Sequence, residues 1–283
     1  MSSAKTPKNL LILTTESDMS ILRVKQVAEQ KGFPVQLFFY SDLFIDSLPI
    51  AKLNVPEATV LLPRQPYTAN NIDQNYAPVL EILLEKYPFA KVIDRKLYQK
   101  SFIQYEDKLY HSYIFDKQKV AYAKMFSVPQ LQKQFTPIIA KKRLSSRGNA
   151  NFIFTEKLDF ERFVHTHDVT QYLYQEYLPL KADFRVLVLG YEVVGIVKRK
   201  IKIKDGNRVT VEVESVGELP LSILSQCREI ALTLGCEFCG FDIGQTDNNS
   251  LFFIEYNTSP QFEGFERETG INVAEKLLSY CFA

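Results

Sequence analysis

The chain has 283 residues, of which 46% are hydrophobic and 24% charged, and this composition excludes a disordered chain, a collagen and a coiled coil. Lysine and arginine number 34 against 33 for aspartate and glutamate, so the net charge of +1 provides no general attraction for nucleic acid or for an anionic membrane. At this length about three quarters of the extended chain's surface can be buried, enough for several subdomains with cores of their own.

The apolar runs and the cysteines of the sequence indicate the cellular compartment in which we expect the protein. The first apolar run, Leu10–Leu13, is too short for a signal-peptide core. The most apolar stretch, 186–197, is interrupted at Gly190 and falls short of the roughly 20 residues that span a bilayer. Cys236 and Cys239 form C-x-x-C in apolar surroundings without a nearby histidine, which favours core thiols over a zinc or redox site. We therefore expect a cytoplasmic protein with reduced cysteines and no membrane partner.

The first third of the sequence alternates short apolar runs with helical patterns. The runs predict strands at 9–15, 35–40, 58–62 and 91–93, and the patterns predict helices at 17–30 and 73–86. This order is typical of a small α/β domain. The glycine signatures of Rossmann domains and P-loops are absent, as are the nucleophile elbow and the zinc-protease motif.

The remainder of the chain has a mixed pattern. A helical pattern covers 96–126, and 135–154 reads as a strand, a polar loop and a second strand. There follow a helix at 156–165, an aromatic strand at 171–178, two hairpins (185–199 around Gly190-Tyr191, and 200–214), a helix at 221–234, strands at 238–243 and 251–256, and a helix at 272–280. We expect an α/β domain at 1–96 followed by two α+β lobes at 97–178 and 179–283.

Three hard oxygen ligands lie near the end of the chain. Glu255 and Asn257 are two residues apart on one predicted strand, so their side chains share a face, and a hairpin partner can place Asp242 beside them. Two carboxylates and an amide suit Mg²⁺, which shares its ligand shell with nucleotide phosphates. The alternative is that three polar residues fall at strand ends by chance.

Two further groups of residues suit a nucleotide. Lysines and arginines at the edges of apolar segments can bind phosphate, and the polar loop after one of them can wrap phosphate oxygens; these residues are Lys108, Lys141, Arg185, Arg199, Ser145, Ser146 and Gly148. The connector Glu176-Tyr177-Leu178, read as an edge strand, can offer backbone groups to adenine, and the Asp183 carboxylate can bind ribose. Solvated strand edges are the alternative for each group.

Taken in order, these segments resemble the ATP-grasp superfamily, and specifically the RimK-type carboxylate-amine ligases. The resemblance covers nearly the whole chain, and its most specific part is the C-terminal block. The matching segments are EDK (106–108), PIIAK with SSRG (137–148), YQEYL (174–178), DFRVLVLG (183–190), VKR (197–199), GFD (240–242) and IEYNTSPQFEGFERETGINVA (254–274).

The resemblance implies an ATP-grasp fold, with an N-terminal preATP-grasp α/β domain and two α+β lobes clasping ATP. In that family a substrate carboxylate attacks the γ-phosphate of ATP, and an amine then displaces phosphate from the acyl phosphate to form an amide. The implied roles are Mg²⁺ binding, with Mn²⁺ as the alternative ion (Asp242, Glu255, Asn257), ATP binding (Lys108, Lys141, Ser145, Ser146, Gly148, Glu176, Tyr177, Leu178, Asp183), catalysis near the γ-phosphate (Arg185, Arg199) and substrate binding (Ser259, Arg267). The implied partner is an amino acid, a peptide or a protein tail, and relatives often form homo-oligomers.

Departures from the family pattern leave the substrate open. The loop lacks a second glycine near Asn149 or Ala150, and Gln261 stands where glycine is usual. The basic run 198–208 suits a solvated hairpin face paired with Glu212 and Glu214, an acidic substrate or, least well, nucleic acid. Two further functions are therefore retained as alternatives: a non-catalytic nucleotide-binding or scaffold protein, and a phosphotransferase that stops at a phosphorylated product.

Overall fold

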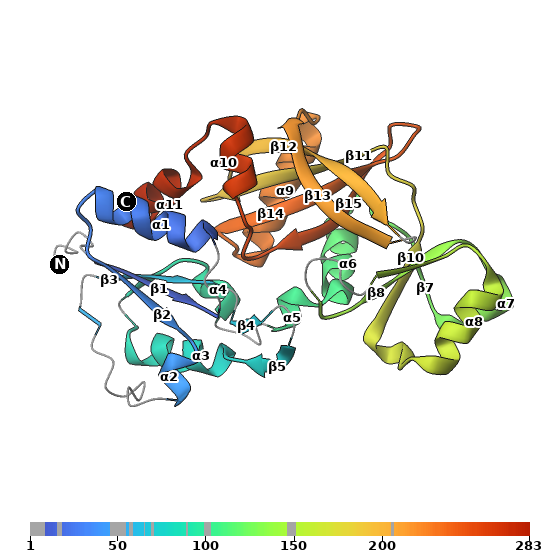
Figure 1. Cartoon of the computed structure of the whole chain (residues 1–283), viewed down its shortest axis with the longest axis horizontal. Coiled ribbons are helices and arrows are strands. Elements are labelled where there is room, and N and C mark those ends of the chain that lie inside the picture. Colours follow the sequence, from blue (N-terminus) through green and yellow to red (C-terminus); the bar gives the residue numbers. More distant parts are fainter. Residues whose placement is uncertain are drawn as a thin grey trace.

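The computed structural model describes residues 9–15, 19–45, 55–56, 59–64, 66–68, 71–88, 90–98, 103–145, 151–204 and 207–283. Its three larger sheets and their covering helices form three bodies: the N-terminal and C-terminal ones lie against each other, and the central one projects at one end (Figure 1). Among the described residues, no helix combines the length and the apolar character that crossing a membrane requires.

The N-terminal body is built on a parallel sheet in the order β2-β1-β3-β6. Leu11 and Leu13 of its central strand pack into one core cluster, whereas Leu10 and Ile12 pack into another on the opposite face. A strand buried on both faces needs a continuous apolar run, which explains the sequence of β1. The elements are β1 (Asn9–Thr14), α1 (Met19–Gln30), β2 (Val35–Phe39), α2 (Asp42–Ile45), β3 (Thr59–Pro63), β4 (Tyr67–Thr68), β5 (Asn71–Asn75), α3 (Ala77–Lys86), β6 (Lys91–Val92) and α4 (Arg95–Tyr98).

The helix expected at 73–86 begins only at Ala77. Residues 71–75 instead form β5, which pairs with β4 in a small two-stranded sheet. Pro78 explains the start, because proline lacks an N–H and is tolerated only in the first turn of a helix.

The central body carries an antiparallel sheet in the order β7-β10-β8-β9. The prediction of a helix through residue 126 is wrong beyond Gln118, where α6 ends. The helical stretch is also divided, because the Asp107 carboxylate accepts a hydrogen bond from the Leu109 N–H at 2.9 Å and so caps the start of a new helix. The elements of this body are β7 (Met125–Phe126), α7 (Val128–Lys133), β8 (Ile138–Lys142), β9 (Asn151–Phe154), α8 (Lys157–Thr166), the 3₁₀ turn Val169–Gln171 and β10 (Tyr172–Glu176). Before them in the chain come α5 (Ile103–Glu106) and α6 (Lys108–Lys117), and α6 packs against β15 (Leu251–Asn257) of the C-terminal body.

The C-terminal body carries a five-stranded antiparallel sheet in the order β13-β12-β11-β14-β15. The two expected hairpins share one long strand, β12, so that β11, β12 and β13 form a meander. The turn at Gly190-Tyr191 has both residues at positive φ, 59° and 65°, which is the pattern of a type I′ turn. The elements are β11 (Ala182–Leu189), β12 (Glu192–Lys204), β13 (Asn207–Val216), α9 (Leu221–Leu234), β14 (Phe238–Gln245), β15 (Leu251–Asn257), α10 (Glu263–Thr269) and α11 (Val273–Phe282).

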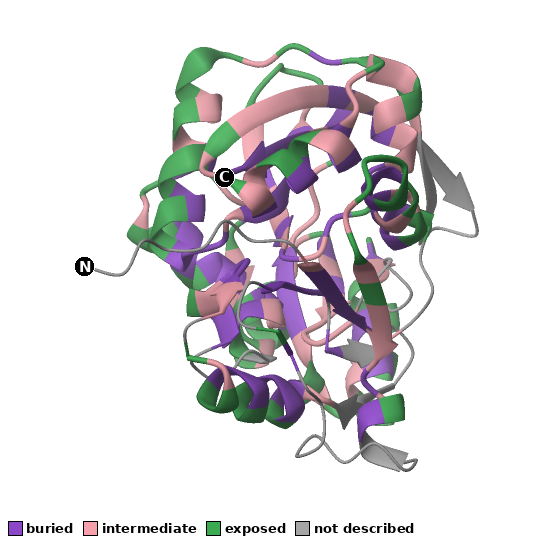
Figure 2. Ribbon diagram, turned by 90° about the vertical axis from the view of Figure 1, so that its left-hand side faces the viewer, coloured by how far each residue is buried: buried purple, intermediate pink, exposed green. Residues whose placement is uncertain are grey.

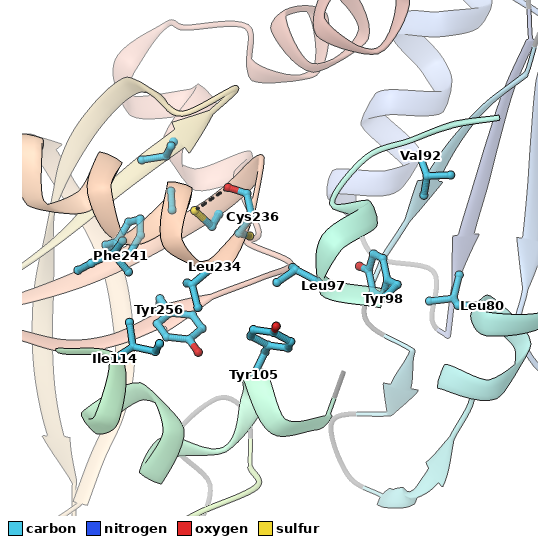
Figure 3. Close-up of a cluster of buried hydrophobic side chains, with 14 of the residues drawn as sticks. Leu80, Val92, Leu97, Tyr98, Tyr105, Ile114, Leu234, Cys236, Phe241 and Tyr256 are labelled. Atoms are coloured by element: carbon cyan, nitrogen blue, oxygen red, sulfur yellow. Dashed lines mark hydrogen bonds between the residues drawn. The ribbon is translucent and has the colours of Figure 1, made fainter. Parts of the chain in front are cut away.

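Two hydrophobic clusters continue from the N-terminal body into the C-terminal body. Figure 3 shows Leu97 of α4 between Tyr98 on the side of the parallel sheet and Leu234 of α9 on the other side. The helices turn their buried positions toward these cores and their exposed positions outward (Figure 2). All four cysteines are free and buried, as expected for core thiols. The continuous core fixes the C-terminal sheet against the N-terminal body.

Candidate active site

Charged side chains form a row on one face of the five-stranded sheet. Arg199 of β12 lies directly opposite Asp183 of β11, Arg185 of β11 lies opposite Asp242 of β14, and Asp242 lies opposite Glu255 of β15. Directly opposed residues in a sheet point to the same face, as do residues two apart on a strand. The register therefore collects five ionisable side chains from four strands on one surface.

Four of these side chains form a continuous chain of ion pairs. Arg185 donates from Nε to Oδ1 of Asp242 at 2.9 Å and from Nη2 to Oδ2 at 3.0 Å. Arg199 Nη2 lies 2.9 Å from Asp242 Oδ2, and Arg199 Nε donates to Asp183 Oδ1 at 2.9 Å. Side-chain exposure is 20% for Arg185 but only 7% for Arg199 and 0% for Asp183. Of the two arginines, Arg185 is thus the one nearer to solvent.

The network determines the charge of Asp242. Burial by itself would raise the pKa of this carboxyl, but the guanidinium groups of Arg185 and Arg199 outweigh burial and hold the pKa well below its usual range. Asp242 is consequently ionised throughout the physiological range of pH, as a metal ligand must be.

A β-bulge brings Glu255 onto the charged face. Phe253 and Tyr256 are both buried in the core although they are three residues apart, which regular alternation along a strand does not allow. The register between β14 and β15 shifts after Asp242, so that Ile243 opposes Phe253 and Ile254 is the extra residue. Beyond the bulge, Glu255 shares the face of Asp242.

The expected metal ligands are therefore brought together. Asn257 lies two residues beyond Glu255 and opposite Gly240, so it occupies the same face as Asp242. The Asn257 Nδ2 atom is buried and has no hydrogen-bond partner. Among the residues that the structure describes, the Glu255 carboxylate makes no hydrogen bond or ion pair. The site therefore holds a buried amide, which can turn either its oxygen or its nitrogen toward a ligand.

The donor set fits Mg²⁺ better than a transition metal. In the described part of the chain, no group of three or more His, Cys, Asp and Glu side chains could hold a metal ion. Asp242, Glu255 and Asn257 offer two carboxylates and one amide, and Mg²⁺ usually takes one or two carboxylates and completes its shell with water and phosphate oxygens.

The expected phosphate-binding lysines approach from the central body. Lys108 is buried, and its Nζ donates to the Ser145 carbonyl at 2.7 Å and to Ser145 Oγ at 3.1 Å. Asp107 accepts a hydrogen bond from Arg143 Nη2 at 2.6 Å, which ties the start of α6 to the end of β8. Lys141 lies on β8 opposite Leu173. Ser146 and Gly148 lie outside the described residues, so only the start of the expected phosphate loop is placed.

The expected adenine-binding segment begins at Glu176, the last residue of β10, and β10 is not an edge strand. β10 lies between β7 and β8, but β7 ends at Phe126 and pairs only with Tyr174 and Gln175. The Glu176 N–H donates to the Lys124 carbonyl at 2.8 Å, and the Tyr177 N–H donates to the Pro137 carbonyl at 3.1 Å. Within the described part of the chain, the Leu178 N–H donates to no backbone carbonyl.

The two expected substrate residues are placed differently. Ser259 follows Asn257 by two residues, and its Oγ is buried without a hydrogen-bond partner. Arg267 lies on α10 with its side chain 68% exposed, and its Nε donates to Glu268 at 2.8 Å. Ser259 is therefore buried just beyond the end of β15, whereas the contacts of Arg267 do not connect it to the charged row.

Two residues missed by the sequence reasoning hold the segment after Asn257. Arg64, which follows β3, is buried and donates from Nη2 to the Pro260 carbonyl at 2.9 Å. Glu106, at the end of α5, accepts a hydrogen bond from Thr258 Oγ1. The position of Arg64 at the carboxyl end of a parallel strand was an available signal, because ligands of open α/β sheets bind at that edge.

The fold and the residues of this row agree with one known family. The RimK-like ATP-grasp domain matches residues 115–281, which is more than half of the chain. The chain belongs to this RimK-like ATP-grasp family.

Curated relatives match over shorter stretches. A probable alpha-L-glutamate ligase of Enterobacter sp. (strain 638) is 36% identical over 115 residues, which are 38% of this chain and 37% of that protein. The N-acetylaspartylglutamate synthase A of Homo sapiens is 29% identical over 154 residues, which are 51% of this chain and 38% of that protein. The chain thus spans less than two thirds of the length of these relatives.

Solved structures match over almost the whole chain. The ATP-grasp ligase PsnB complexed with minimal precursor has a TM-score of 0.71 at 15% identity, with 96% of this chain and 99% of that chain covered. The macrocyclase MdnC bound with precursor peptide MdnA, from Microcystis aeruginosa MRC, has a TM-score of 0.66 at 16% identity, with 96% and 99% covered. At these identities the likeness establishes the fold, and the expected ATP-grasp fold is confirmed.

Proposed function

We propose that this protein is an ATP- and Mg²⁺-dependent ligase that joins a carboxylate to an amine through an acyl phosphate. The observation that carries the proposal is the row on the five-stranded sheet, where Asp242 and Glu255 oppose each other and two guanidinium groups lie beside them. Paired carboxylates for a divalent cation next to cations for phosphate are what phosphoryl transfer from ATP requires.

In this proposal Asp242, Glu255 and Asn257 hold Mg²⁺, with Mn²⁺ as the alternative ion. The metal would neutralise charge on the transferring phosphoryl group. Arg185, the more exposed arginine, turns toward the γ-phosphate, while Lys108 and Lys141 bind phosphate oxygens at the start of the loop. Because charge neutralisation and orientation accelerate this reaction, no conspicuous general base is needed.

The proposed nucleotide pocket lies at the junction of the central and C-terminal bodies. The backbone of Glu176, Tyr177 and Leu178 meets adenine there, with the Leu178 N–H as a donor. Ser145, Ser146 and Gly148 complete the phosphate loop in this proposal. The segment 176–178 is thus assigned to the adenine of ATP, and the loop that begins at Ser145 is assigned to its phosphates.

An amino acid, a peptide or a protein tail is the proposed substrate. Support comes from relatives named glutamate ligases and from a fold shared with ligases solved with precursor peptides. Ser259 is the proposed substrate contact, because its hydroxyl is buried without a partner two residues beyond Asn257. Arg267 is the second proposed contact, which requires its exposed side chain to leave Glu268. A cytoplasmic location and a homo-oligomeric state belong to the same proposal.

The test follows both half-reactions in one incubation. The protein is mixed with Mg²⁺-ATP, pooled amino acids and short acidic peptides, and phosphate release is measured together with product masses. Phosphate release with a product one water lighter than its two substrates combined is the expected result. ADP release with a phosphorylated product and no free phosphate would replace the ligase by a phosphotransferase.

Glu255→Gln is the variant that tests the metal site within the same assay. The Glu255 carboxylate has no partner among the described residues, so its neutralisation removes a proposed metal ligand without breaking an ion pair. We expect this variant to remain folded and to release no phosphate above background. ATP binding by the wild-type protein with no turnover in any pool, protein tails included, would favour a non-catalytic nucleotide-binding protein.

A further inference from the structure

The corner between α5 and α6 contacts the chain on both sides of Asn257. Tyr256, the residue before it, lies in the core with its ring against the His111 ring of α6, and the two ring centroids are 3.9 Å apart. Thr258, the residue after it, is buried and donates a hydrogen bond from Oγ1 to Glu106, the last residue of α5. Two contacts from one corner therefore enclose a proposed metal ligand.

The amide of Asn257 depends on the backbone around it for its position. Its Nδ2 atom is buried without a hydrogen-bond partner, and β15 ends at this residue. Its partner across the ladder is Gly240, which has no side chain to pack against the amide. Whatever fixes the backbone at 256–258 therefore also fixes the direction in which this amide points.

The His111 ring is itself held in one orientation and one charge state. Its Nε2 lies 2.9 Å from the Tyr105 carbonyl, and because a carbonyl only accepts, Nε2 carries a hydrogen and donates it. Burial, and after it the charge of Lys108 one turn earlier on α6, lower the pKa of His111 to about 3, so the ring is neutral. His111 Nδ1 and the Tyr256 hydroxyl are both buried without a hydrogen-bond partner, so the contact between the two rings is one of packing.

We propose that the corner between α5 and α6 positions Asn257 for Mg²⁺ by holding the residues on either side of it. His111 acts through the ring of Tyr256, and Glu106 acts through the hydroxyl of Thr258. This inference rests on the metal-binding part of the proposed function and not on amide formation. Both His111 and Glu106 are positioning residues in it, and neither touches the metal or the nucleotide.

The dissociation constant of ATP in EDTA divided by that in Mg²⁺ measures how much the metal adds to binding. Calorimetry gives this ratio for the wild-type protein, for Thr258→Val and for the matched control Thr166→Val, which loses a hydroxyl that donates to the Arg162 carbonyl at 3.0 Å on α8. We expect Thr258→Val to lower the ratio about fivefold, the effect of one hydrogen bond, with ATP binding in EDTA within about twofold of wild type. Thr166→Val should leave the ratio unchanged.

A double-mutant cycle separates positioning of Asn257 from a general loss of structure. His111→Leu removes the imidazole but keeps an apolar side chain in the core, and it should also lower the ratio about fivefold. In an Asn257→Ala background, His111→Leu and Thr258→Val should each change the ratio by less than about twofold, because a contact that acts through Asn257 has no effect once its amide is gone. Thr258→Val carries the test alone if His111→Leu fails to fold.

Two results overturn the inference and leave the proposed function standing. One is a wild-type ratio in Thr258→Val, which would separate the Glu106 contact from the metal. The other is a fivefold effect that persists in the Asn257→Ala background, which would make the corner a general structural support. Wild-type protein that binds no ATP, or binds it equally well with and without Mg²⁺, would overturn the proposed metal site and the inference with it.

Discussion

Two buried aspartates, Asp94 and Asp242, lie in different parts of the molecule and carry opposite charge preferences. Asp94, at the contact between the N-terminal and C-terminal bodies, is 2% exposed, and Asp242, in the charged row, is 4% exposed. Burial raises the pKa of Asp94 to about 7, whereas two guanidinium groups hold the pKa of Asp242 below its usual range despite burial. Burial is thus common to both, and the partners decide the charge.

The partners of Asp94 are mainly neutral or acidic. Its carboxylate accepts hydrogen bonds from the N–H groups of Glu237 and Phe238, and the nearby Glu237 carboxylate accepts from the Tyr280 hydroxyl at 2.6 Å. Burial is the largest cause of its raised pKa, the backbone hydrogen bond from Phe238 lowers the pKa, and the charge of Glu237 raises it again. Arg64 has a weaker lowering effect. A structural contact between bodies can use a neutral acid, but a metal site cannot.

The largest expected effect comes from removing a carboxylate of the charged row. Asp242→Ala leaves Arg185 and Arg199 without their shared partner, and the free energy of unfolding should fall by about 3–5 kcal/mol. Glu255→Ala removes a carboxylate with no partner among the described residues and should lower the free energy of unfolding by only about 0.5 kcal/mol. Urea denaturation of both variants measures the contrast.

Binding of Mg²⁺-ATP is the second measurement on the variants Asp242→Ala and Glu255→Ala. If both carboxylates hold the metal, both variants lose Mg²⁺-dependent nucleotide binding although only Asp242→Ala loses stability. Wild-type binding by Glu255→Ala would contradict the proposed metal site, and equal losses of stability would contradict the described network.

The two aspartates should give stability profiles of opposite slope. Because the pKa of Asp94 is raised from 3.8 to about 7, its contribution is fully present below about pH 4 and is lost as the pH rises through 7. Between about pH 5 and pH 8 the loss amounts to about 3 kcal/mol. Asp242, with a lowered pKa, contributes above about pH 4 and loses its contribution only in stronger acid.

Denaturant melts at several pH values, with Asp94→Asn beside the wild-type protein, isolate the Asp94 contribution. Asparagine keeps a hydrogen-bond acceptor for the Phe238 N–H but does not titrate, so the slope between about pH 5 and pH 8 should flatten in this variant. A wild-type slope that survives in Asp94→Asn would mean that another group carries it.

Elements bounded by local signals were predicted best. Helix α9 has the predicted bounds, Leu221–Leu234, because Pro220 precedes it and Gly235 ends it in the left-handed conformation at φ 69°. β12 was predicted as two strands, because two register shifts within it interrupt the alternation that marks one strand. Its continuity depends on pairing with β11 and β13, which no local pattern records.

The candidate site was predictable only where the spacing along one strand determines it. The shared face of Glu255 and Asn257 follows from the period of two, but the bulge at Ile254 that selects that face depends on packing of Phe253 and Tyr256. The bond between Asp183 and Arg199 depends on register across a turn, and the contact of Arg64 with Pro260 joins segments 196 residues apart. Such long-range contacts are set by the tertiary fold, not by neighbouring residues.

The smallest expected effect comes from replacing Lys198, the neighbour of Arg199 on β12. Comparing these two residues contrasts an exposed ion pair with a buried one on the same strand. Lys198 Nζ lies 3.3 Å from Glu214 on β13, with side-chain exposures of 40% and 45%. Water screens such a pair, so Lys198→Met should change the free energy of unfolding by less than about 1 kcal/mol, and by less still in high salt. Urea denaturation at low and high salt, with Arg199→Met alongside, gives the comparison. A loss for Lys198→Met as large as that for Arg199→Met would show that the strand, and not the burial of the pair, determines the effect.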